Sequence, residues 1–284
     1  MERSSSSCIK EIMPNSYTQN NLYESLFQRD SIGLYSGKMG AALYRLHYAR
    51  VYADEKQEET ALTLIDEIQQ AINADTHFGY AEGLAGMGSA LCYLFREGFV
   101  CPQEDDYFSE LDNYFFNKVY FEKHADLSRA TGLIGIGCYM FHRIKDLPTD
   151  NYMSLQLRCS LLLIQDVLFA ALGMNGYTYP YLKSDSLTEL SVIDMKGFLE
   201  KMLKSGLCPE LTRKALNIID ETYHTQPTIF EDIEVVYTNN DMQAFRNRLK
   251  CIADLPDLTE NSPIRLLANL QLQDMSLPSW WELF

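Results

Sequence analysis

Apolar residues along most of this chain recur every three or four positions, which is the spacing of one face of an α-helix. Residues 38–52 are an example, with Met39, Leu43 and Leu46 on the apolar stripe, and residues 61–72 repeat the pattern. The same spacing predicts further helices over residues 105–122, 153–172, 188–204 and 209–223. Strand signals are weak throughout. The pattern therefore predicts an all-α protein.

Three of the apolar helices open with the pattern Gly-x-x-Gly. The copies are Gly37 and Gly40, Gly83 and Gly86, and Gly132 and Gly135, separated by steps of 46 and 49 residues. After each copy come an apolar helix, a polar break and a second amphipathic helix. One repeat unit is thus a helical hairpin whose more apolar first helix faces inward. Glycine costs a helix about 1 kcal/mol relative to alanine, so we interpret these glycines as points of close approach at the helix starts.

The repeats predict a single domain of stacked hairpins. We expect units at residues 33–75, 79–122 and 128–172, a degenerate fourth at 186–223 without the glycine pair, and atypical C-terminal helices over 228–284. Hairpins of this size stack into an open solenoid or close into a ring of inner helices wrapped by outer ones.

The chain closes with an aromatic stretch that contains Trp280, Trp281, Leu283 and Phe284. So much apolar surface is expected to lie in a groove. The groove belongs either to the chain itself or to another chain, which would allow self-association or docking through the residues from Trp280 to Phe284.

Charge and composition narrow the class of partner. The net charge of −15, from 39 acidic and 24 basic residues, argues against binding to nucleic acid or to an anionic membrane surface. The longest apolar stretch, residues 159–174, contains Gln165 and Asp166 and is interpreted as a buried helix, so no membrane insertion is expected. Seven scattered cysteines and an N-terminus without an apolar leader predict a cytoplasmic protein with reduced thiols.

The loops before the three inner helices are predicted to meet at one end, the mouth. Lys38 and Arg129 there could offer positive charge to an acidic peptide or a carboxylate, or form surface salt bridges instead. Free N–H groups at the helix starts could face an anion or a carbonyl group. The candidate ligand-binding residues at the mouth are Lys38, His77, Tyr80, Glu82, His124 and Arg129.

Other titratable residues give weaker signals. Glu82 is the best single carboxylate, but the equivalent repeat positions are Ser36 and Thr131, so no second carboxylate completes an acid–base pair. His77 and His124 precede the second and third glycine pairs and are either functional or simply loop residues. His47 and His142 lie late on inner helices and are expected to be packed in the core or at its rim.

The segments "GLYSGKMGAALYRLHYAR", "GLAGMGSALCYLFREGFV" and "GLIGIGCYMFHRI" resemble the first three repeats of lanthionine synthetase C-like proteins, the peptide cyclases of lantibiotic biosynthesis. The resemblance covers about residues 10–145 well and 150–223 loosely. It implies an α/α toroid of six or seven helix pairs, of which this chain is a shortened form. Catalytic members hold a central zinc ion, which activates a peptide cysteine to attack a dehydroamino acid.

The chain departs from the family at the positions that carry the chemistry. The family's zinc is held by two cysteines and a histidine, in Trp-Cys-Tyr-Gly-like and Cys-His-Gly motifs, and neither a Trp-Cys nor a Cys-His pair occurs here. The late cysteines are Cys208 and Cys251. Where catalytic members carry an aspartate before the third repeat, this chain has Ser128, with Asp126 two residues earlier, and Thr188 stands nearest their fourth-repeat histidine.

These departures predict a member without zinc, other cofactors or catalytic residues. We interpret it as a protein that binds a peptide, or a partner enzyme, in peptide modification or natural-product maturation. Two enzymatic alternatives stay open: a thioether-forming cyclase with non-standard ligands, and a toroid enzyme that uses mouth carboxylates such as Glu82.

Overall fold

The computed structural model describes residues 31–101, 107–182, 187–223, 233, 236–256, 258–259 and 262–284. In that part of the chain every regular element is helical, which confirms the all-α prediction. The helices are α2 (Lys38–Tyr52), α3 (Glu55–Ala71), α4 (Leu84–Arg96), α5 (Ser109–Phe121), α6 (Leu133–Lys145), α7 (Tyr152–Ala171), α8 (Glu189–Lys204), α9 (Pro209–Tyr223), α11 (Met242–Ala253), α12 (Pro263–Gln273) and the 3-10 helix η1 (Trp280–Leu283).

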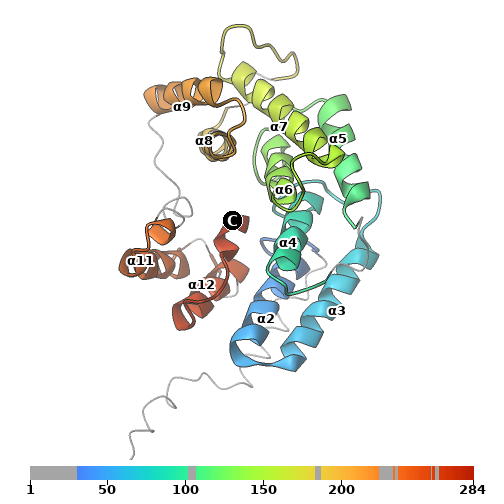
Figure 1. The fold of residues 1–284 in the computed structure, drawn as a ribbon, viewed down its shortest axis with the longest axis vertical. Coiled ribbons are helices and arrows are strands. Elements are labelled where there is room, and N and C mark those ends of the chain that lie inside the picture. Colours follow the sequence, from blue (N-terminus) through green and yellow to red (C-terminus); the bar gives the residue numbers. More distant parts are fainter. Residues whose placement is uncertain are drawn as a thin grey trace, which may run out of the picture.

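The helices form two concentric layers. Helices α2, α4, α6 and α8 follow one another on the inside, each in contact with the next, while α3, α5, α7 and α9 lie outside them (Figure 1). Helix α12 packs against α2, so the last described pair, α11 and α12, returns to the first. The predicted toroid of hairpins is therefore present, with five helix pairs in the described residues. Almost every residue of α6 is buried, as expected for an inner helix.

The paired glycines let each loop fold back over the helix that it precedes. A Cβ atom on Gly83 would lie 2.1 Å from the carbonyl oxygen of His77, and one on Gly86 would lie 1.8 Å from that of Tyr80. A Cβ atom added to either glycine of the first or third copy would likewise lie too close to the carbonyl oxygen of the residue six positions earlier. No side chain fits at such distances, so the close-approach interpretation is confirmed.

These loops also cap the inner helices. The first helical N–H groups of Lys38, Leu84 and Leu133 donate to loop carbonyls seven residues earlier, at 3.0, 2.9 and 3.0 Å. The expectation that these groups are free to meet an anion is therefore wrong. A helix start satisfied by its own loop has no orphan donor left at that position.

Helix α7 is the one helix in the described residues that is long and apolar enough to cross a membrane. Its position gives that finding little weight, because α7 packs against α5 and α6. The buried Gln165 amide also donates to Thr212 Oγ1 on α9 at 2.5 Å. Length and apolar composition are also typical of a core helix.

The buried His47 on α2 makes stability depend on pH. Its Nε2 forms a hydrogen bond of 3.0 Å with the Tyr93 hydroxyl, and burial, aided by the charge of Arg50, lowers its pKa from 6.5 to about 3. Between these values only the unfolded chain binds the proton, so stability is full above pH 6.5 and falls as the pH decreases toward 3. The slope from this group is about 1.4 kcal/mol per pH unit.

We expect His47→Gln to lose that part of the slope. Urea unfolding between about pH 4.5 and 7 would measure it, with His77→Gln, an exposed histidine, as the matched control. Equal slopes for wild type and His47→Gln would contradict the assignment.

Candidate ligand-binding site at the mouth and interior of the ring

The three loops that precede α2, α4 and α6, here called the mouth loops (residues 31–37, 77–83 and 126–132), are joined by one repeated hydrogen-bond pattern. The N–H groups of Leu34 and Tyr35 both donate to the Ala81 carbonyl, at 2.9 and 3.0 Å. One repeat later, Tyr80 and Ala81 donate to the Ala130 carbonyl, at 2.8 and 3.0 Å. The mouth is therefore a continuous main-chain network, which holds its side chains in fixed relative positions.

The pattern changes after the third loop because the fourth unit has no glycine pair. The Arg129 N–H donates instead to the side chain of Asp194 on α8, at 2.8 Å. Burial raises the pKa of Asp194, and the bond from the Arg129 backbone and the charge of Arg129 oppose that rise. A carboxylate thus takes the place that a loop carbonyl occupies between the earlier repeats.

Two exposed carboxylates on the mouth loops are held by hydroxyl groups. Glu82 accepts from Ser31 Oγ at 2.5 Å and from Ser36 Oγ at 2.7 Å. Asp126 accepts from the backbone N–H of Ser128 at 2.8 Å and from Thr131 Oγ1 at 2.6 Å. Burial alone would raise the pKa of Asp126, but these hydrogen bonds outweigh it and hold the pKa below its usual value. The mouth therefore presents two carboxylates in fixed orientations, and the hydrogen bonds to Asp126 favour its ionised form.

The two cations expected at the mouth are engaged elsewhere. Lys38 Nζ pairs with Glu67 Oε2 on the outer helix α3 at 2.7 Å. The Arg129 guanidinium lies 5.0 Å from the centre of the Tyr80 ring and donates to the main-chain oxygens of Leu283, at 3.1 Å, and Phe284. The salt-bridge alternative thus describes Lys38, whereas Arg129 binds the end of the chain itself.

The remaining candidates divide between surface and core. His77 is exposed, and its Nδ1 accepts from the Gly79 N–H at 2.9 Å. Tyr80 is fully buried, so it is not part of the exposed mouth. His124 is also buried and donates from Nε2 to the Lys118 carbonyl near the end of α5, at 2.9 Å, which gives it a capping role. Ligand binding by any of these side chains stays a prediction.

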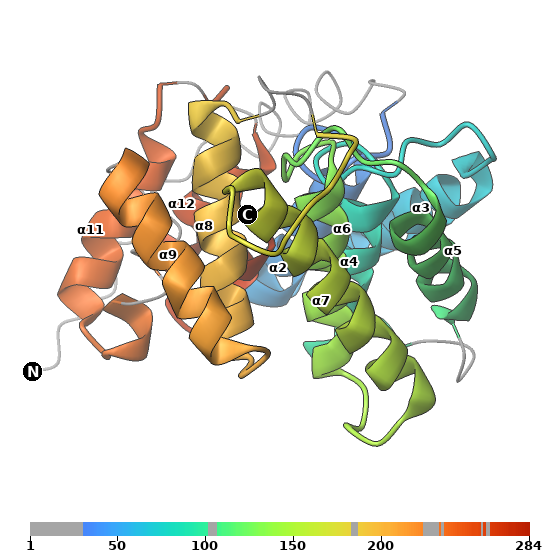
Figure 2. The same ribbon diagram turned by 90° about the horizontal axis from the view of Figure 1, so that it is seen from above.

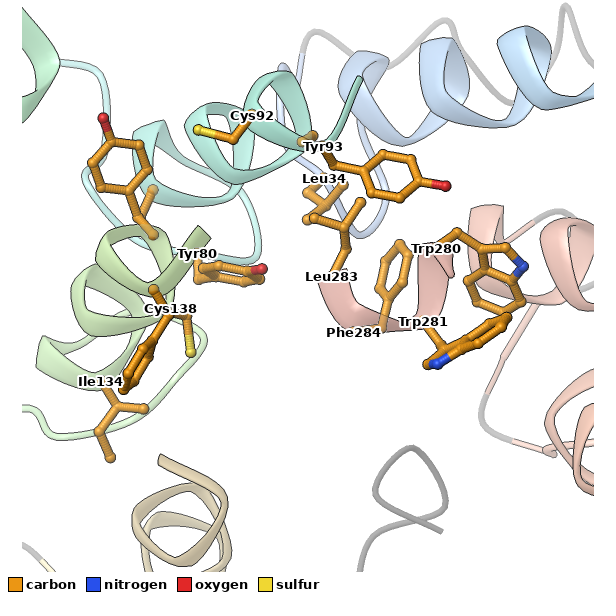
Figure 3. Packing of buried hydrophobic residues seen from close by; sticks show 14 of the residues in the cluster. Leu34, Tyr80, Cys92, Tyr93, Ile134, Cys138, Trp280, Trp281, Leu283 and Phe284 are labelled. Atoms are coloured by element: carbon orange, nitrogen blue, oxygen red, sulfur yellow. The ribbon is translucent and has the colours of Figure 1, made fainter. Parts of the chain in front are cut away.

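Residues 279–284, here called the aromatic segment, lie inside the ring. Trp280, Trp281, Leu283 and Phe284 are all buried against the chain's own helices (Figure 3), so of the two alternatives for the groove the structure shows the one within the chain. The Phe284 ring lies 5.5 Å from that of Tyr35 on the first mouth loop.

Ionic contacts also hold the aromatic segment. The Glu282 carboxylate lies 2.8 Å from Lys145 Nζ at the end of α6 and 3.4 Å from Arg96 Nη2 at the end of α4. This set could not be predicted from the sequence, because Glu282 lies more than a hundred residues from either cation. The one available signal was an acidic residue inside an otherwise apolar stretch.

A cavity of about 440 Å³ opens between α6, α8 and the aromatic segment. Figure 2 shows the positions in the ring of α8 and α6, two of the helices that line this cavity. Arg129 and Asp194 line the end of the cavity near the mouth, and Lys145 and Lys204 line the other end. None of the α8 residues in this cavity was a sequence candidate.

The residues that the structure describes do not fit a zinc ion. A catalytic zinc needs three protein ligands, and the described residues contain no group of three or more His, Cys, Asp or Glu side chains that could hold a metal. Of the two late cysteines, Cys208 lies in a turn with a φ of 48° and Cys251 is exposed on α11. His224 lies outside the described residues.

A scan against protein-family models finds a match to the lanthionine synthetase C-like protein over residues 4–165. The matched range is more than half of the 284 residues and contains all three glycine pairs. A comparison with curated proteins finds no significant match.

Proposed function

Because the chain belongs to the lanthionine synthetase C-like family, we propose that it is a non-catalytic member that binds a peptide, or a partner enzyme through a peptide segment, in peptide modification. The fold of the family is retained in the repeats that its model matches. The proposed loss of the chemistry is supported by the sequence, in which neither the Trp-Cys nor the Cys-His pair of the family's zinc motifs occurs. We further propose that it acts in the cytoplasm, in the maturation of a modified peptide.

The observation that carries this proposal is the way the ring holds the aromatic segment. Arg129 donates to two successive main-chain oxygens, a contact that any peptide could make regardless of its sequence. Tyr35 receives an aromatic ring, and the ends of α4 and α6 receive a carboxylate. These are the elements of peptide recognition: a main-chain clamp, an apolar contact and a charge contact. The aromatic segment therefore serves as an internal example of the ligand.

The two tryptophans of the chain, Trp280 and Trp281, both belong to this segment, so intrinsic fluorescence reports on it selectively. We expect a labelled peptide Leu-Pro-Ser-Phe-Phe-Glu-Leu-Phe to bind the full chain and to shift tryptophan emission to the red as it displaces the segment. Glu282→Gln should raise the affinity roughly two- to tenfold, because it weakens the competing segment at two ion pairs worth about 0.2–1 kcal/mol each. Fluorescence anisotropy measures the affinity.

Glu122→Gln is the matched control, since Glu122 pairs with Lys118 within α5, away from the segment. A second labelled peptide, with lysine in place of glutamate, should bind more weakly than the first, both to the wild-type chain and to Glu282→Gln. Equal binding of the two peptides, or no binding at millimolar concentration, would overturn the proposal.

Stoichiometric zinc with cysteine and histidine ligation in the purified chain would favour the cyclase alternative instead. A hydrolytic activity of the wild-type chain that is lost in Glu82→Gln would favour the alternative of a toroid enzyme that uses mouth carboxylates.

A further inference from the structure

The cavity between α6, α8 and the aromatic segment has one apolar part and one cationic part. Ile134, Phe141 and Phe198 line it from the helices, and Trp281 and Phe284 line it from the segment. Figure 3 shows Ile134 and Cys138 of α6 on one side of this space, with Trp281 and Phe284 on the other. Its volume of about 440 Å³ is within the range of small-molecule sites, roughly 300–1,000 Å³.

The cationic part lies at the end of the inner helices that is opposite the mouth. Lys145 is the last residue of α6, Lys204 is the last residue of α8, and Lys201 lies one turn before it. Arg158 of α7 also lines this end. The mouth, with its carboxylates, and this cationic end are therefore separate regions of the ring.

The charge of the cavity differs from that of the chain. Five basic residues line it against three acidic ones (Asp194, Glu200 and Glu282), whereas the whole chain has 24 basic and 39 acidic residues. Lysines at helix C-termini also complement the helix dipole, a role that needs no ligand. That role explains neither Arg158 on the neighbouring helix nor the apolar space that these cations border.

A buried imidazole adds an unused polar group. His142 lines the cavity, its side chain is 3% exposed, and its Nδ1 is buried with no hydrogen-bond partner in the described part of the chain. Burial, followed by the nearby charges of Lys201 and Lys145, holds its pKa well below the usual value. The ring is therefore neutral, and the same cations create a positive potential around it.

The geometry points to a second binding site in this cavity, for an apolar acid. The ligand's aromatic or branched aliphatic body would lie between Phe198 and Trp281, its carboxylate would face Lys145, Lys201 and Lys204, and His142 would donate or accept one hydrogen bond. Such a carboxylate would compete with Glu282 for Lys145, which now pairs with it at 2.8 Å. The site does not depend on the proposed peptide function. A free acid with an apolar body offers the same chemistry as a peptide segment that contains an acidic and an apolar residue.

Calorimetry on the full chain can test this inference with probes that separate the two parts of the ligand. We expect 2-naphthylacetate to bind with a submillimolar Kd, and both its neutral amide and acetate alone to bind at least tenfold more weakly. The Lys201→Gln/Lys204→Gln double variant should lose about tenfold or more in affinity for the acid, as expected for charge-assisted contacts. High salt should weaken binding of the acid and not of the amide.

Lys196→Gln is the matched control, because Lys196 is on the same helix but pairs with Asp220 of α9 at 2.7 Å. If the double variant unfolds at nearly the same temperature as the wild type, its lower affinity reflects lost binding and not lost folding. Equal binding of acid and amide, or no change in the double variant, would overturn the inference. A tripeptide Gly-Glu-Phe amide that binds while naphthylacetate does not would assign the same site to a peptide side chain, and would leave the test of the peptide-binding proposal unaffected.

Discussion

Replacing Asp112 by alanine is expected to lower the free energy of unfolding by about 3–5 kcal/mol, because it leaves a buried arginine without its counter-charge. Asp112 on α5 is fully buried. It accepts from Arg143 Nε at 3.0 Å and from the Tyr139 hydroxyl at 2.5 Å, both on α6. The Arg143 guanidinium also lies 4.7 Å from the centre of the Phe108 ring, so this cluster joins an outer helix to an inner one.

The partners of Asp112 allow the charge effect to be separated from the loss of shape. Tyr139→Phe removes one neutral donor and should cost about 1 kcal/mol. The double variant Asp112→Leu/Arg143→Met removes both charges and should recover most of the loss, since a buried ion pair is often replaceable by apolar residues of similar size. Urea unfolding followed by circular dichroism measures all three. A loss below about 1 kcal/mol for Asp112→Ala would mean that the Arg143 charge finds other compensation.

The sequence predicted the helices and their inward faces because both follow from local periodicity. The apolar stripe of residues 38–52 is helix α2 almost to the residue, and the C-terminal helices expected within residues 228–284 include α11 and α12. The glycine pairs predicted the mouth loops because only glycine allows a carbonyl as close as that of Tyr80 to Gly86. These signals need no information from distant residues.

The site was less predictable because its contacts join residues far apart in the chain. Nothing near Arg129 in the sequence indicates that its guanidinium binds residues 283 and 284. Asp112 lies in an amphipathic helix, where an acidic residue is usually solvated, and the packing of α5 against α6 and α7 buries it. The prediction of free N–H groups failed for a similar reason, since a loop that reverses over six residues uses those donors itself.

Replacing Trp280 by alanine is expected to cost about 3–5 kcal/mol, the usual range for a fully buried aromatic residue. Trp280 is 0% exposed. Its indole N–H donates to Gln271 Oε1 on α12 at 3.1 Å, and the Gln271 amide in turn donates to the Leu277 carbonyl at 3.1 Å. Truncation would therefore open a cavity and leave a buried amide oxygen without its donor, and both effects destabilise the ring where α12 returns to α2.

Two further variants serve as comparisons for Trp280→Ala. Trp280→Phe keeps most of the apolar volume and should lose clearly less than Trp280→Ala, because the cavity is smaller. Tyr152→Ala removes an aromatic side chain that is 78% exposed and should stay within about 0.5 kcal/mol of wild type. If Trp280→Ala were as stable as Tyr152→Ala, the aromatic segment would be only loosely held. In that case it would be free to dock into another chain, and the peptide proposal would lose the observation on which it rests.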